Sequence, residues 1–146
     1  MKKHLIQAAE RGDAEAQFNL AVMYENGVLD SRYVAEGSRP EALRWFLAAA
    51  EQGLARAQVK LAEIYAAEPA QPDGSLEACK WYLLATRELR GGHLQKAQSA
   101  YQRVAVCLTP AQTAEVSRFV ESWKPKLVPP IAAMSVPTEI TGRTLA

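Results

Sequence analysis

Apolar side chains recur along this chain at the spacing of an α-helix rather than that of a β-strand. Ala16, Leu20 and Tyr24 occupy positions i, i+4 and i+8, which places them on one stripe of a helix. Residues 42–49 carry Ala, Trp, Phe and Ala at i, i+3, i+4 and i+7, a second helical face. The pattern predicts helices and no strand. We expect helices at residues 3–11, 13–26, 40–52, 54–67, 75–90, 93–107 and 110–123.

Turn and capping signals fall between these segments. Gly12 and Gly53 follow Ala-rich helices, where a residue with left-handed backbone ends a helix. Gly27 follows the predicted helix at 13–26 and is expected to end it in the same way. Pro40 stands in a predicted first turn, where its missing N–H costs nothing. Residues 109–112 (Thr-Pro-Ala-Gln) form a capping box. The longest predicted interruption is therefore the one between residues 27 and 39.

One motif occurs twice. Residues 8–24 and 49–65 share Ala, Ala, Glu, Gly, Ala, Ala, Gln, Leu, Ala and Tyr in a single register. A second match places 42–46 (Ala-Leu-Arg-Trp-Phe) over 78–82 (Ala-Cys-Lys-Trp-Tyr). The repeated unit is about forty residues long, the size of one helix pair in a solenoid. Such pairs bury a core by stacking, so we expect Trp45 and Trp81 to be core residues.

These residues resemble a known family. The pattern Ala-Ala-x-x-Gly-x-Ala-x-Ala-Gln-x-x-Leu-Ala-x-x-Tyr, followed by Ala-x-x-Trp-x-x-x-Ala-Ala at 42–50, is similar to the Sel1-like repeat, a relative of the tetratricopeptide repeat. The resemblance covers roughly 8–124 and is weaker at 78–106, where Leu89 replaces the expected Gly. It implies an all-α fold, a short right-handed α/α solenoid of about three helix pairs.

The chain changes character after the last predicted helix. We expect a Sel1-like repeat solenoid at 1–124 and a Pro-rich C-terminal tail at 125–146. Apolar residues stand between the prolines of this tail, so it does not have the composition of a solvated linker. We expect 127–136 to pack on the solenoid, covering its open end or part of its groove, or to bind a second copy of the chain.

Composition argues against several classes of protein. Lys and Arg number 17 against 16 Asp and Glu, a net charge of +1, so no nucleic-acid partner is expected. No apolar run is long enough for a signal peptide or a membrane span. We therefore expect a cytoplasmic protein with no membrane association.

Catalytic chemistry has few candidate residues. His4 and His93 are the two histidines, and neither has a recognisable nucleophile beside it in sequence. Cys79 and Cys107 lack metal-ligand spacing and are expected to be half-buried thiols in a reducing compartment. We therefore expect no catalytic, cofactor-binding or metal-binding residues, and no enzyme. A hydrolase or metal enzyme stays open as an alternative from another class.

The resemblance implies a binding function. In the tetratricopeptide fold the first helix of each pair lines a concave face, and its non-motif positions point inward. The expected function is a protein–protein interaction module, an adaptor or regulator that holds a peptide or small protein. The alternative is a stoichiometric inhibitor or immunity-type protein that neutralises a toxin or enzyme. The implied partner-binding residues are Glu15, Phe18, Asn19, Val22, Arg56, Val59, Lys60, Glu63, Lys96, Ser99 and Arg103.

Overall fold

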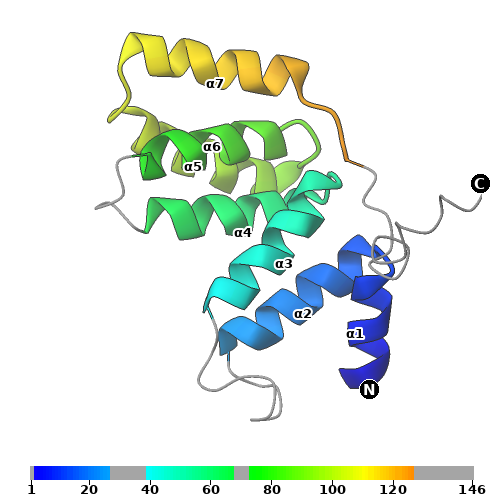
Figure 1. Ribbon diagram of the computed structural model, residues 1–146. Helices are drawn as coiled ribbons and strands as arrows, with labels where there is room; N and C mark the ends of the chain where they lie inside the picture. The colour runs from blue at the N-terminus through cyan, green and yellow to red at the C-terminus, as the bar shows by residue number, and fades with distance from the viewer. Residues whose placement is uncertain (1, 27–38, 68–72, 127–146) are drawn as a thin grey trace, which may run out of the picture. The chain divides into compact units, whose positions relative to one another are not determined.

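The computed structural model describes residues 2–26, 39–67 and 73–126 of the chain (Figure 1). Within those ranges every regular element is an α-helix, which confirms the predicted all-α class, and the helix pairs are those of a short α/α solenoid. The helices are α1 (Lys2–Glu10), α2 (Ala14–Asn26), α3 (Arg39–Glu51), α4 (Ala55–Ala66), α5 (Gly74–Ala85), α6 (Gly91–Ala105) and α7 (Pro110–Ser122).

Most predicted boundaries agree with these bounds to within two residues, but the helix expected at 75–90 ends five residues early. After Ala85 the backbone tightens: the N–H groups of Arg87 and Glu88 donate to carbonyls three residues back, at 3.1 and 3.0 Å. Arg90 is then extended, and Gly91 has a φ of 57°. Residues 86–90 are compatible with a helix, so the sequence pattern predicted that the helix continues through them. In the structure they form the turn that connects α5 to α6.

The other turn signals have mixed outcomes. Gly12 and Gly53 have φ of 102° and 104°, so the predicted left-handed stops are confirmed. The capping box is also present, with Thr109 Oγ1 accepting from the N–H of Gln112 at 3.1 Å and the Gln112 side chain accepting from the N–H of Thr109 at 2.9 Å. The predicted stop at Gly27 and the apolar tail at 127–136 lie outside the described residues.

The chain divides into two compact units, and the first comprises residues 1–52 and 126–146. Within it α2 packs against both α1 and α3. Leu20 of α2 and Phe46 of α3 are fully buried, together with small alanines that let the helices approach closely. Lys126 joins this unit through its N–H, which donates to the Glu51 carbonyl at 2.7 Å, and through its Nζ, 3.2 Å from Glu51 Oε2.

A buried glutamine connects the helices of the first unit. Gln17 is 2% exposed, and its Nε2 donates to the Ala9 carbonyl at the end of α1, 3.0 Å away. Its Oε1 accepts from Gln52 Nε2, just beyond α3, at 2.9 Å. One side chain therefore joins three helices, and both of its polar atoms are satisfied.

The second unit spans residues 53–125, and α5 is its central helix (Figure 1). It packs against α4, α6 and α7. Leu76 and Cys79 of α5 and Val116 of α7 form a buried apolar cluster, joined by half-buried residues of α6 and of the turn that follows it. Trp81 is 5% exposed, as expected of a core residue, and Trp45 of the first unit is also buried.

Helix α7 is fixed on α5 by aromatic and charged contacts. The Trp81 and Phe119 rings meet edge to face, with centroids 5.6 Å apart. Lys80 Nζ lies 5.5 Å from the centroid of the Phe119 ring and 3.3 Å from the carboxylates of both Glu77 and Glu115. Burial by itself would lower the Lys80 pKa, but the two carboxylates outweigh it and raise that pKa. Lys80 therefore holds its charge inside this contact.

Candidate binding groove

An open groove with a volume of about 990 Å³ lies in the second unit, between α4 and α6. One wall is α4, which contributes Arg56, Val59 and Glu63 at i, i+3 and i+7. These three positions share a face because successive residues of a helix turn by about 100°. The other wall is α6, which contributes the residues His93, Gln95, Lys96, Ser99 and Arg103.

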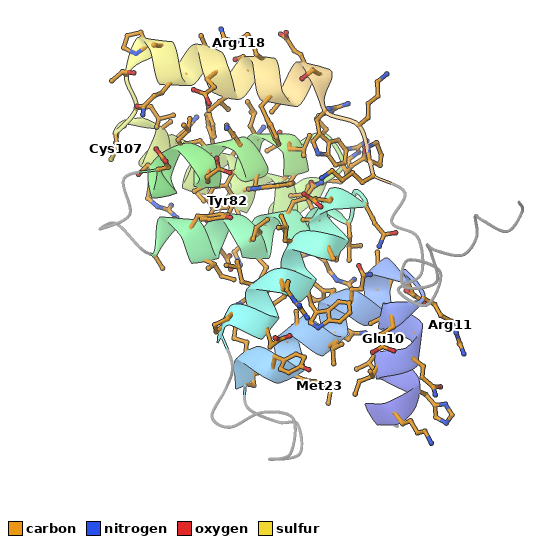
Figure 2. All side chains as sticks on the ribbon, viewed as in Figure 1. Glu10, Arg11, Met23, Tyr82, Cys107 and Arg118 are labelled. Atoms are coloured by element: carbon orange, nitrogen blue, oxygen red, sulfur yellow. The ribbon has the colours of Figure 1, made fainter. Side chains whose placement is uncertain are left out.

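The floor of the groove is formed by buried, mainly apolar side chains. Ala97 and Ala100 of α6 are buried against the unit and add only methyl groups to the floor. Tyr82 of α5 is 5% exposed and lies in the layer between α5 and α4 (Figure 2). Burial and then the nearby Glu63 carboxylate raise the Tyr82 pKa, while the Arg103 guanidinium opposes them. The phenol therefore lies within electrostatic reach of both walls and stays neutral at physiological pH.

The walls carry an excess of positive charge. Arg56, Lys96 and Arg103 face the groove, against the single carboxylate of Glu63. All four side chains are exposed. Within the described part of the chain, Lys96 and Arg103 have no ion-pair partner, unlike the doubly paired Lys80 of α5. The groove is thus locally basic although the chain as a whole carries a net charge of only +1.

The structure brings together most of the expected partner-binding residues of the second unit. Arg56, Val59, Glu63, Lys96, Ser99 and Arg103 all line the groove, whereas Lys60 does not. The agreement arises because α4 and α6 are the first helices of neighbouring pairs and point equivalent faces toward the same space.

The four expected residues of the first unit lie on α2. Glu15 and Asn19 are exposed, and Val22 is half-buried. Phe18 was expected among the partner-binding residues. Its side chain is half-buried, and its ring packs edge to face on Phe46 of α3 with centroids 5.5 Å apart. Phe18 therefore contributes to the packing of the first unit.

Sequence reasoning missed several groove residues. Tyr82 belongs to the second helix of its pair and follows Trp81, so its position reads as core. Leu89 lies in the turn where the repeat pattern has a glycine. This departure from the pattern was the one sequence signal that could have marked Leu89 as a groove residue. His93 and Gln95 lie in the first two turns of α6 and widen the predicted stripe of Lys96, Ser99 and Arg103.

The two cysteines have opposite environments, which corrects the expectation that both are half-buried. Cys79 is fully buried in the α5–α7 cluster. Burial, and to a lesser extent the nearby Cys107, raise its pKa to about 11. Cys107 is exposed and lies just beyond α6, in the turn that leads to α7 (Figure 2). In residues 2–26, 39–67 and 73–126 no group of three His, Cys, Asp or Glu side chains could hold a metal ion.

This difference predicts how the thiols react. In the native protein at pH 8, one thiol per chain should react quickly with a disulfide reagent, because thiolate chemistry needs both access and ionisation. The second, Cys79, should react only after unfolding in guanidinium, since its pKa of about 11 keeps it protonated. Absorbance at 412 nm would follow the released thiolate. In Cys107→Ser the fast phase should disappear, and two fast thiols in the native wild type would contradict this account.

The fold and the groove define a helical-repeat protein with an open inner face on one of its units. The Sel1 repeat family model matches residues 14–54 and 55–88, which correspond to the pairs α2–α3 and α4–α5. The chain belongs to the Sel1 repeat family. Repeats of this family generally mediate protein–protein interaction.

A search of curated proteins gives no match, and neither does a search of solved structures. None of the described helices is both long enough and apolar enough to span a membrane.

Proposed function

We propose that this protein is a cytoplasmic interaction module, an adaptor or regulator, which holds a segment of a partner protein in the groove between α4 and α6. One observation carries the proposal. The helices α4 and α6, each the first helix of its pair, together direct six exposed or half-buried non-motif side chains into one open groove. Membership of the Sel1 repeat family supports a protein partner. The exposed thiol of Cys107 fits a reducing compartment.

The dimensions of the groove favour a peptide segment. Helix α4 has 12 residues and is about 18 Å long at 1.5 Å per residue. An extended peptide rises about 3.3 Å per residue, so about five or six residues fit along the wall. A standard protein–protein interface needs about 800 Å² from each partner, which is more than this groove offers. A short segment of a larger protein therefore fits better than a whole docking domain.

A matched pair of Val→Glu substitutions tests the proposal. Val59 is half-buried in the groove, whereas Val106 is 82% exposed at the end of α6 and does not line it. Val59→Glu should reduce partner affinity at least tenfold because it places a charge and extra volume where the segment lies. Val106→Glu should leave affinity unchanged. The measurement is capture of partners from the source cell, followed by titration of the purified partner.

Circular dichroism must first show that both variants keep the wild-type helix content. If a folded Val59→Glu variant still captures the same partner with wild-type affinity, the groove is not the binding surface. The dissociation rate then separates the proposed role from that of a stoichiometric inhibitor. An adaptor should release its partner within seconds to minutes, whereas an inhibitor should hold it far longer.

A further inference from the structure

We infer that the occupant of the groove is an acidic peptide segment, with its carboxylates along the α6 wall and an apolar side chain over Val59. The inference rests on the proposed function, which it extends by naming the chemistry of the partner. It is carried by the charges that face the groove and by their contrast with the paired Lys80 of the same unit.

The α6 wall supplies the main electrostatic argument. Lys96 and Arg103 lie seven residues apart, two helical turns or about 10 Å along the axis. An extended peptide places residues i and i+2 on one side, about 7 Å apart, and residues i and i+4 about 13 Å apart. Flexible Lys and Arg side chains span this difference, so one strand can present carboxylates to both. Ser99 lies between them and can donate a hydrogen bond from its hydroxyl.

Lys96 and Arg103 differ in their pairing from Lys80 of the same unit. Lys80 is only 14% exposed on its side chain, and two carboxylates at 3.3 Å neutralise it. Lys96 and Arg103 are exposed and carry no ion pair to any described residue. Their charge is therefore available to a bound peptide. Arg103 can hold a carboxylate through two parallel hydrogen bonds.

The start of α6 reinforces this field without carrying the inference. Gly92 and His93 line the groove, the first turn of α6 holds no acidic residue, and the N-cap residue Arg90 makes no side-chain capping hydrogen bond. The amino end of a helix carries a partial positive charge. No Cβ group at Gly91 or Gly92 would meet another atom within 4 Å, so a peptide backbone can approach closely.

The apolar part of the groove argues for a peptide over a nucleic acid. Val59 on the α4 wall lies next to the floor formed by Tyr82, Ala97 and Ala100. A side chain of a peptide can bury apolar area against these residues. A phosphate backbone needs a long basic track, while the whole chain has a net charge of +1.

Selection from a random dodecapeptide library displayed on phage tests the inference. Wild type should enrich peptides of negative net charge that contain at least one large apolar residue. A Lys96→Glu/Arg103→Glu double variant should bind those peptides at least tenfold more weakly, measured by fluorescence anisotropy in 0.15 M salt. The matched control is Arg118→Glu/Lys124→Glu, which makes the same change of net charge at exposed positions outside the groove. This control should bind like wild type.

The outcomes separate the two proposals. Peptides that need Val59 but are neutral or basic would overturn the acidic preference and leave the groove as a binding site. A control double variant that loses as much affinity as the groove variant would overturn the preference too. Failure of any peptide to distinguish wild type from Val59→Glu would overturn the proposed function itself. Groove-dependent binding of a labelled twelve-nucleotide oligothymidylate, tighter than that of the acidic peptides, would assign the cations to nucleic acid instead.

Discussion

Replacing Trp81 with alanine should lower the free energy of unfolding by about 3–5 kcal/mol. Trp81 is 5% exposed and is one of the largest side chains in the core of the second unit. Its removal leaves a cavity beneath α7 and breaks the edge-to-face contact with Phe119, whose ring centroid lies 5.6 Å away. The cavity cannot collapse easily because α5 is packed against three other helices. Urea denaturation followed by circular dichroism would measure the loss.

A double-mutant cycle identifies the aromatic contact within that loss. Phe119→Ala alone should also destabilise, and the two substitutions together should cost less than their sum by about 0.5–1.5 kcal/mol. Trp81→Phe should cost less than Trp81→Ala because part of the volume is restored. A cost below about 1 kcal/mol for Trp81→Ala would contradict the core assignment and favour a surface role for this side chain.

Replacing Gln17 with leucine should cost about 1–3 kcal/mol of stability. Leucine keeps most of the volume, so the loss comes from hydrogen bonding. The Ala9 carbonyl and the Gln52 amide would both lose their bonds to a side chain that is 2% exposed. The Ala9 carbonyl keeps its bond from the Gly12 N–H at 3.0 Å, so the loss is that of two hydrogen bonds, each worth about 0.5–1.5 kcal/mol. Thermal denaturation and urea denaturation should both record the change.

Gln52→Ala is the matched control for this prediction. It removes only the 2.9 Å bond to Gln17 Oε1 at a partly buried site, and it should cost about 1 kcal/mol. The bond from Gln17 to the Ala9 carbonyl would remain. If Gln17→Leu were no worse than Gln52→Ala, the link between α1 and α2 would not contribute to stability and the buried glutamine would be a packing residue only.

Local sequence signals were enough to predict the elements of the fold. Helical periodicity predicted the helices because each has an apolar face to bury, and the conformational needs of Gly12 and Gly53 marked two helix ends. The capping box of Thr109 was predicted for the same reason, since its hydrogen bonds involve neighbours in sequence. The repeat register also predicted which face of α4 and of α6 would be turned toward a groove.

Contacts between helices distant in sequence were not predictable in this way. The early end of α5 depends on a turn whose residues also tolerate a helix. Nothing in the sequence pattern pairs Lys80 with Glu115, because that contact requires the packing of α7 on α5. Residues at equivalent positions of two repeats also differ in their hydrogen bonds. Gln17 and Gln58 are equivalent and both buried, yet the Gln58 Oε1 atom accepts no hydrogen bond from the described residues, whereas Gln17 Oε1 accepts one.

For the groove too, the sequence predicted residues whose position depends on a single helix and missed those whose position depends on how the helices pack. Val59 and Arg103 were predicted because each occupies a fixed position within its own helix. Tyr82 was missed because its place on the floor depends on how α5 packs between α4 and α6. The basic excess appeared only when α4 and α6 were placed on either side of the groove, since the charges of the chain nearly balance along the sequence.

An NMR titration of the ¹⁵N-labelled protein with an enriched acidic peptide tests the central claim most directly. The account predicts that the largest amide shift changes fall on Val59, Ala97, Ser99 and Ala100, and that they disappear in Lys96→Glu/Arg103→Glu. Saturable shift changes concentrated on the exposed face of α7, around Arg118, with the α4 and α6 amides unmoved, would contradict it.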